Sequence, residues 1–91
     1  MSTAAKAGKQ ARIRSVDVTD DAITAHLMDG RSISVPLAWS WRLSRATREQ
    51  RQRYELIGEG TGVRWPEVDE DISVRGMLEG IPARRPGANR N

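Results

Sequence analysis

Residues 23–37 read ITAHLMDGRSISVPL and contain two alternating segments joined by a turn sequence. Apolar side chains occupy every second position from Ile23 to Leu27, and again from position 33 to position 37. Alternation with a period of two is typical of a strand with one buried face. Because an Asp-Gly pair between such segments is a strong hairpin signal, the stretch predicts an antiparallel β-hairpin.

The register of this hairpin depends on the length of its loop. A two-residue Asp-Gly loop would place the apolar set of one strand opposite the polar set of the other. A three-residue loop over residues 28–30, with Gly30 left-handed in a bulge, places the two apolar sets opposite each other, so that Ala25 faces Ile33. We therefore predict the three-residue loop.

Two elements are predicted on either side of the hairpin. Residues 11–18, ARIRSVDV, alternate imperfectly and predict a strand with an irregularity near Ser15. Downstream, Thr47 is followed three residues later by a glutamine, which makes a capping box, and Gly58 is a C-terminal stop signal. These signals predict the main helix over about residues 48–57.

The rest of the chain predicts two short elements. Residues 63–66, VRWP, can form at most a short edge strand, because Pro66 cannot donate to a ladder. Ser73 is a suitable N-cap for a helix over residues 74–79, closed by Gly80. We therefore predict an α+β fold, in which a small antiparallel β-sheet packs against one main α-helix, with a short C-terminal helix.

Composition limits the class of protein. Ninety-one residues can form one hydrophobic core, so we expect a single domain. The chain has no cysteine, so disulfides and thiolate metal sites are excluded. It also has no apolar run long enough for a signal peptide or a membrane span, so we expect a cytoplasmic protein.

Charge is unevenly distributed along the chain, whose net charge is +3. The two ends, residues 1–16 and 82–91, contain seven basic residues and no acidic one, while the middle contains all twelve acids and eight arginines. We expect disordered basic tails over residues 1–10 and 82–91, around one domain over residues 11–81. The predicted domain is mildly acidic, so attraction to nucleic-acid phosphates would come mainly from the tails.

Three segments, DGRSISVPLAW, ATREQRQRYELIG and GVRWPEVDEDISVRGMLEG, resemble a widespread bacterial family, the domain of unknown function 2442 (DUF2442). Family members typically have Pro after the cap Thr and His before the Trp-Pro pair, where this chain has Arg48 and Arg64. The resemblance implies a small antiparallel sheet with one main helix. It also implies a protein often encoded beside another small protein, in pairs that look like toxin–antitoxin modules.

The densest acidic cluster of the chain directly follows a Trp-Pro pair. Its carboxylates fit three interpretations: a solvated loop that caps the next helix, a surface for a basic partner, or a site for a hard cation. The cluster lacks the EF-hand spacing, and we predict no metal site. An aromatic side chain beside fixed negative charge is typical of an interface. The predicted partner-binding residues are Trp65, Glu67, Asp69, Glu70 and Asp71.

Four arginines recur at every third position around the start of the predicted main helix. Their interpretations are a solvated helix face, a phosphate-binding stripe and a docking site for an acidic partner. The candidate contacts for nucleic acid or an acidic partner are Arg42, Arg45, Arg48 and Arg51. Nearby, Trp39 and Trp41 would lie on one side of the third strand if it continued through them, either in the core or as an exposed anchor.

His26 is the only histidine, so a serine nucleophile would have at most one histidine base. Under the predicted register His26 faces away from the apolar set, and we expect an ordinary exposed strand residue. No P-loop or dinucleotide fingerprint is present in the chain. We therefore predict no catalytic residue and no cofactor.

The functional hypothesis is a non-enzymatic protein-interaction or regulatory module, with the antitoxin-like member of a two-protein bacterial system as its specific form. Its partner would be a small protein encoded by a neighbouring gene. One alternative is a nucleic-acid-binding accessory protein that uses the basic tails and the arginine row. The other is a metal-dependent or acid/base enzyme that uses the acidic loop over residues 67–71.

Overall fold

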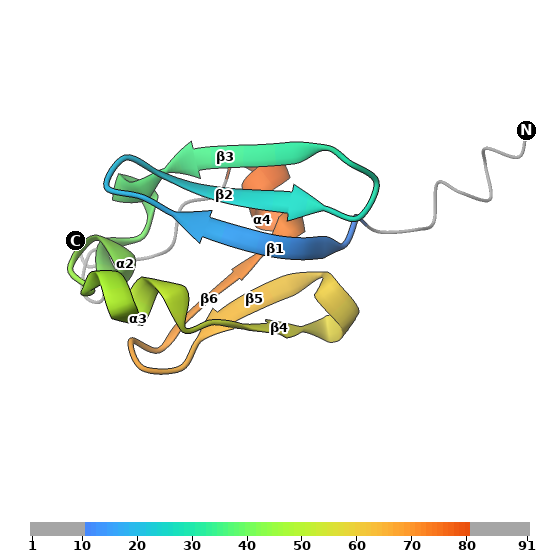
Figure 1. Ribbon diagram of the computed structural model, residues 1–91. Helices are drawn as coiled ribbons and strands as arrows, with labels where there is room; N and C mark the ends of the chain where they lie inside the picture. The colour runs from blue at the N-terminus through green and yellow to red at the C-terminus, as the bar shows by residue number, and fades with distance from the viewer. Residues whose placement is uncertain (1–10, 81–91) are drawn as a thin grey trace, which may run out of the picture.

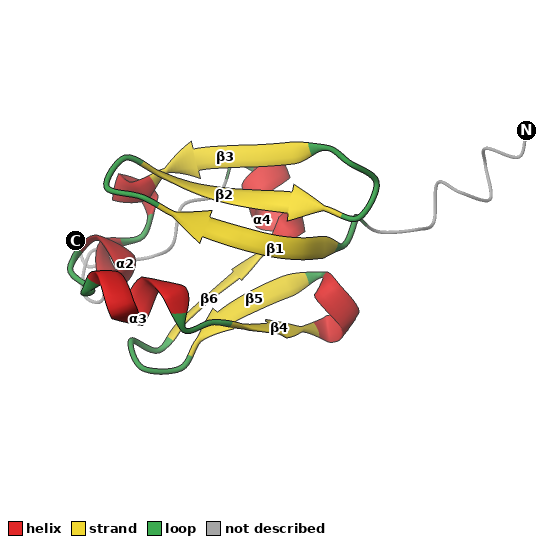
Figure 2. Cartoon of the chain, in the orientation of Figure 1, coloured by secondary structure: helices red, strands yellow, loops and turns green. Residues whose placement is uncertain are grey.

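The computed structural model describes residues 11–80, which form two three-stranded antiparallel sheets and several short helices (Figure 1, Figure 2). The predicted α+β class is confirmed. The first sheet has the order β1-β2-β3 and the second β4-β5-β6. The strands are β1 (Ile13–Val18), β2 (Ala22–Leu27), β3 (Ser32–Pro36), β4 (Glu55–Ile57), β5 (Gly62–Trp65) and β6 (Glu70–Ser73). The helices are η1 (Leu37–Trp39), α2 (Trp41–Ser44), α3 (Arg48–Gln52), η2 (Gly58–Gly60) and α4 (Val74–Glu79).

The hairpin of β2 and β3 has the predicted register. Ala25 pairs with Ile33 across the two strands, and Gly30 is left-handed with φ +97 in the three-residue loop. The irregularity predicted near Ser15 is also present, because the pairing of β1 with β2 shifts between Ile13 and Ser15. One face of this sheet therefore carries the apolar side chains and the other the polar ones, as the alternation requires.

The predicted main helix over residues 48–57 is wrong beyond its first turn. The capping box of Thr47 and Gln50 is present, but α3 ends at Gln52 and has no buried residue. Since no apolar side chain anchors this helix, packing does not extend it. The next residues instead form β4, which pairs with β5, and Gly58 turns this hairpin with φ +57.

β5 is the central strand of the second sheet and not an edge strand, which corrects the prediction for residues 63–66. Pro66 lies just outside the strand, in the turn that leads to β6, where the Val68 amide donates to the Trp65 carbonyl (3.2 Å). Strand pairing in the second sheet therefore does not require a backbone N–H at Pro66. β6 is an element that the sequence did not predict.

Beyond Pro36 the chain turns into η1 and α2, so the third strand does not continue through Trp39 and Trp41, which are both half-buried. The C-terminal helix α4 is as predicted: the Ser73 hydroxyl caps it by accepting from the Gly76 amide (2.9 Å). Left-handed Gly80 ends it.

The two sheets and α4, which contacts β3 and β6, enclose one hydrophobic core. Trp65 and Leu43 have no exposed surface, and the ring of Tyr54 packs 6.2 Å from that of Trp65, measured between centroids. Within the described range, no helix is long and apolar enough to cross a membrane. The predicted tails, residues 1–10 and 82–91, lie outside the described residues. The buried apolar residues are Ile13, Val16, Ile23, Ala25, Leu27, Val35, Leu37, Leu43, Val63, Trp65, Val74 and Met77.

Candidate functional site

Trp65, the predicted aromatic anchor, lies in the core. Its side chain has no exposed surface, and its indole N–H donates to the backbone carbonyl of Arg51 (2.9 Å). A fully buried indole needs such an acceptor, since an unpaired buried donor is costly. Trp65 therefore offers no surface to a partner, contrary to the role that the sequence suggested.

Three of the four predicted acidic residues are exposed and lie beside Arg53 or Arg64. Glu67 accepts from Arg53 (2.9 Å), while Asp71 and Asp69 lie 2.9 and 3.5 Å from Arg64. The Glu67 carboxylate raises the pKa of Arg53, chiefly through this hydrogen bond. The negative charge that the sequence concentrates here is thus largely neutralised within the fold.

Glu70, the fourth acidic residue, is buried and ties β6 to α2. Its carboxylate accepts from the Ser40 hydroxyl (2.5 Å), and that hydroxyl accepts from the Leu43 amide at the N-cap of α2 (3.1 Å). Arg42 lies 4.0 Å from the same carboxylate, with its guanidinium over the Trp41 ring. These contacts give Glu70 and Arg42 structural roles. Among residues 11–80, no group of three or more His, Cys, Asp or Glu is placed to hold a metal ion.

The arginine row does not form one continuous cationic face. Arg51 is largely buried, donates to the Leu43 carbonyl (3.0 Å) and pairs with Asp20 (2.9 Å). Arg42 is turned toward Glu70, as described above. Only Arg45 and Arg48 are exposed and make no ion pair with the described residues. A hollow of about 240 Å³ beside α3 includes both Arg48 and Asp20, so its charge is mixed.

His26 belongs to a hydrogen-bonded chain on the polar face of the first sheet, which sequence reasoning missed. One ring nitrogen lies 2.9 Å from the Ser32 hydroxyl and the other 2.8 Å from the Asp17 carboxylate. The Leu27 amide donates to the Arg31 carbonyl, so the adjacent pair of His26 and Ser32 is a non-hydrogen-bonded pair, whose side chains come closest. The predicted register already placed these two residues opposite each other.

The histidine chain resembles a Ser-His-Asp triad in residue types only. The three side chains lie on an open sheet face, and none of them lines the hollow beside α3 or a second hollow between Ile13 and Leu56. A triad also needs donors that stabilise an oxyanion and a cleft that excludes water. We assign these three hydrogen-bonded side chains a structural role, in which they join the strands β1, β2 and β3.

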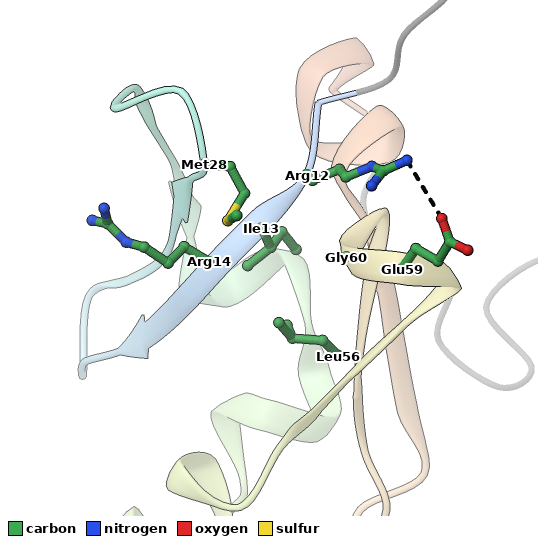
Figure 3. Close-up of a pocket in the computed structure, with 7 residues that line it drawn as sticks. All are labelled: Arg12, Ile13, Arg14, Met28, Leu56, Glu59 and Gly60. Atoms are coloured by element: carbon green, nitrogen blue, oxygen red, sulfur yellow. Dashed lines mark ion pairs between the residues drawn. The ribbon is translucent and has the colours of Figure 1, made fainter.

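A groove of about 400 Å³ lies between β1 and β4, the edge strands of the two sheets that face each other (Figure 3). Ile13 forms its buried floor, while Leu56 and Met28 remain 40% and 65% exposed on its walls. We call it the β1–β4 groove. Its lining residues are Arg12, Ile13, Arg14, Met28, Leu56, Glu59 and Gly60.

Both ends of the β1–β4 groove are closed by contacts from the residues on either side of β4 to β1 and to the residue before it. At one end the Tyr54 hydroxyl accepts from the Val16 amide (3.0 Å). At the other end Arg12 pairs with Glu59 (3.4 Å), and Gly60 packs so tightly on β1 that an added Cβ would lie 3.2 Å from the Ile13 carbonyl oxygen. The groove is therefore a short cradle and not an open channel.

The rim of the groove is more positive than negative. Figure 3 shows the side chains of Arg12, just before β1, and Arg14, within β1, extending to opposite sides of Ile13. Arg12 is paired with Glu59, whereas Arg14 is exposed and forms no ion pair with any residue in the described range. The sequence did not indicate this site, because Leu56 was assigned to a helix and Met28 to a loop.

A family model described as a protein of unknown function, DUF2442, matches residues 13–83. No curated protein matches the chain. The crystal structure of a protein of unknown function from Rhodospirillum rubrum has the same fold, with a TM-score of 0.71 and 24% identity over 86% of this chain and 96% of that one. An uncharacterized protein from Chromobacterium violaceum, solved by NMR, has a TM-score of 0.69 and 27% identity over 84% of this chain and 72% of that one. Because the family model covers most of its length, the chain belongs to the DUF2442 family.

Proposed function

We propose that this chain is a non-enzymatic interaction module that binds a partner protein at the β1–β4 groove. The observation that carries the proposal is the exposure of Leu56 and Met28 over a groove of about 400 Å³, beside Arg14, which makes no ion pair with residues 11–80. Binding pockets are typically concave, mostly apolar and supplied with a few polar groups that fix orientation. The groove has all three properties.

The groove also holds two of the large apolar side chains that the described residues expose. Four such side chains are exposed in the described range, and Met28 and Leu56 line the groove. The other two lie outside it: Ile57 follows Leu56 in β4 and so points to the opposite face of the strand, and Leu78 lies on α4. Exposed apolar side chains that gather at one concave place favour an interaction site, whereas isolated ones are ordinary.

The partner that we propose is the small protein encoded beside this chain, and the complex would be a regulatory or antitoxin-like one. The support is the gene pairing that the family resemblance implies. The β5–β6 turn (residues 66–69) and its acidic neighbours give less support as the interface, because their carboxylates are paired with Arg53 and Arg64.

Co-expression tests this proposal directly. The full chain and the product of the neighbouring gene are co-purified, and the Leu56→Asp variant is compared with wild type. A charge buried at an apolar contact without a partner is strongly unfavourable, so we expect L56D to reduce complex formation at least about tenfold. Leu78→Asp is the matched control, because it places the same charge at an exposed leucine outside the groove.

Three results would overturn the proposal. The first is a wild-type chain that stays free of the neighbouring product at micromolar concentration. The second is a complex that survives L56D unchanged. The third is an equal loss on L56D and L78D, which would indicate a general effect of added charge. Circular dichroism of each variant shows whether the fold is retained.

A further inference from the structure

We propose that the β1–β4 groove recognises an acidic peptide segment that carries one large apolar side chain between its acidic residues. The inference rests on the proposed interaction function and adds the chemistry of the partner. It follows from three features of the groove: its closed ends, its apolar floor and the placement of its two arginines.

The closed ends decide how a partner can enter. A partner strand running along β1 would need the outward backbone groups of that strand, but the Val16 amide already donates to Tyr54. At the other end Gly60 lies against the Ile13 backbone and the Arg12 Cβ, which leaves no room for a strand there. Addition of a partner strand between β1 and β4 is therefore blocked, and a partner must insert a side chain from outside.

The floor and walls decide which side chain fits. Ile13, Leu56 and Met28 present aliphatic carbon and sulfur to the hollow, so an aromatic or large aliphatic side chain is the occupant that they can desolvate. Methionine is unbranched and adapts its shape, and its sulfur makes favourable contacts with aromatic rings. The exposed Met28 can therefore close over an inserted ring.

The two arginines decide the charge of the flanking residues. The side chains of Arg12 and Arg14 extend to opposite sides of Ile13 (Figure 3), so a peptide anchored over Ile13 would meet a guanidinium on each side. Arg14 is unpaired within residues 11–80, and Arg12 can exchange Glu59 for a peptide carboxylate at little cost, since both side chains are exposed. Acidic residues before and after the anchor fit this arrangement.

The test uses the full chain and short fluorescein-labelled peptides measured by fluorescence polarisation. The probe peptide has one central Trp flanked by Glu residues. One comparison peptide has Ala in place of Trp, and another has Lys in place of Glu. We expect the Trp-to-Ala peptide to bind at least about tenfold more weakly, as for loss of an interface anchor, and the Lys peptide to lose binding.

Variants of the chain separate the groove from the basic tails. We expect Leu56→Ala to weaken binding of the acidic probe at least about fivefold and Arg14→Glu about three- to tenfold. Arg45→Glu is the control, because Arg45 also makes no ion pair with the described residues but lies outside the groove, and we expect it to leave binding unchanged. The inference is overturned if the Ala peptide binds as well as the Trp peptide. It is also overturned if R14E and R45E have equal effects, or if L56A has none.

The outcomes also distinguish this inference from the proposed function. If the neighbouring protein binds in an L56D-sensitive manner but the peptides show no preference for acidic flanks, the groove is an interface and the charge assignment is wrong. If the acidic probe binds the groove but the neighbouring protein does not form a complex, the recognition chemistry stands and the proposed partner is wrong.

Discussion

The β5–β6 turn and the β1–β4 groove contrast in what the sequence suggests and what the fold presents. The segment that contains the turn has the densest charge in the chain and a tryptophan, yet the tryptophan is buried and three carboxylates face arginines. The groove is made from residues dispersed along the chain, yet it exposes Leu56 and Met28 beside Arg14, which has no ion-pair partner in the part of the chain that the structure describes. The charge of a sequence segment therefore does not give the charge of the surface that it forms, because neighbours in space can neutralise it.

The largest effect that separates the two regions is expected for Trp65→Ala. This fully buried side chain fills the centre of the core, so its removal should lower the free energy of unfolding by about 3–5 kcal/mol. Leu56→Ala, in the groove, should cost about 1 kcal/mol, because the leucine is 40% exposed. Urea unfolding measures both changes. Equal losses of unfolding free energy in the two variants would show that Trp65 and Leu56 do not differ as a core residue and a surface residue should.

The next largest effect on stability distinguishes the buried Glu70 from the exposed Glu67 within the predicted acidic site. Glu70→Ala should lower the free energy of unfolding by about 1–3 kcal/mol, because it leaves the buried Ser40 hydroxyl without its acceptor. Glu67→Ala should change it by at most about 1 kcal/mol, because its pair with Arg53 is exposed. Thermal unfolding of the two variants checks this order. A larger loss for Glu67 would mean that the turn contributes more to stability than its exposure indicates.

A smaller effect concerns the end of the groove. Tyr54→Phe removes the hydroxyl that accepts from the Val16 amide and should lower the free energy of unfolding by about 1 kcal/mol. Hydrogen exchange of the Val16 amide should become faster, while amides inside the pairing of β2 with β3 keep their rates relative to global unfolding. Unchanged exchange at Val16 would show that Tyr54 does not close the groove.

The smallest effect is a pH dependence of stability at Asp29, which belongs neither to the β5–β6 turn nor to the lining of the groove. The Arg31 amide donates to Asp29, and this bond, together with the Arg31 side chain, lowers the pKa of Asp29 below its ordinary value of 3.8. A lowered pKa gives stability that is present above pH 3.8 and is lost as pH falls through the folded-state value. The difference in melting temperature between wild type and Asp29→Asn should therefore narrow as the solution is acidified. A difference that is constant with pH would contradict this assignment.

Local patterns predicted the parts of the fold that depend on neighbouring residues. The β2–β3 register, the capping box at Thr47 and the helix capped by Ser73 each depend on a few adjacent side chains, and all three are present. The length of the main helix was not predictable in this way. The residues after Gln52 pair with β5, and this tertiary pairing outweighs the weak helix signal.

The candidate site was less predictable than the fold, for a physical reason. The groove joins residues from β1, β4, η2, the β2–β3 turn and the segment before β1. Only the packing of the second sheet against β1 brings Leu56 near Ile13. The row of Asp17, His26 and Ser32 was partly foreseeable, because the predicted register sets His26 opposite Ser32. The pairing of Arg64 with Asp71 required β6, which the sequence did not predict.

NMR titration of the isotope-labelled full chain with the product of the neighbouring gene would locate the binding surface. We expect the largest chemical-shift changes on the amides of the β1–β4 groove, at residues 12–16, Met28 and residues 56–60. Changes centred on the β5–β6 turn at residues 66–69, with the groove unaffected, would contradict this expectation.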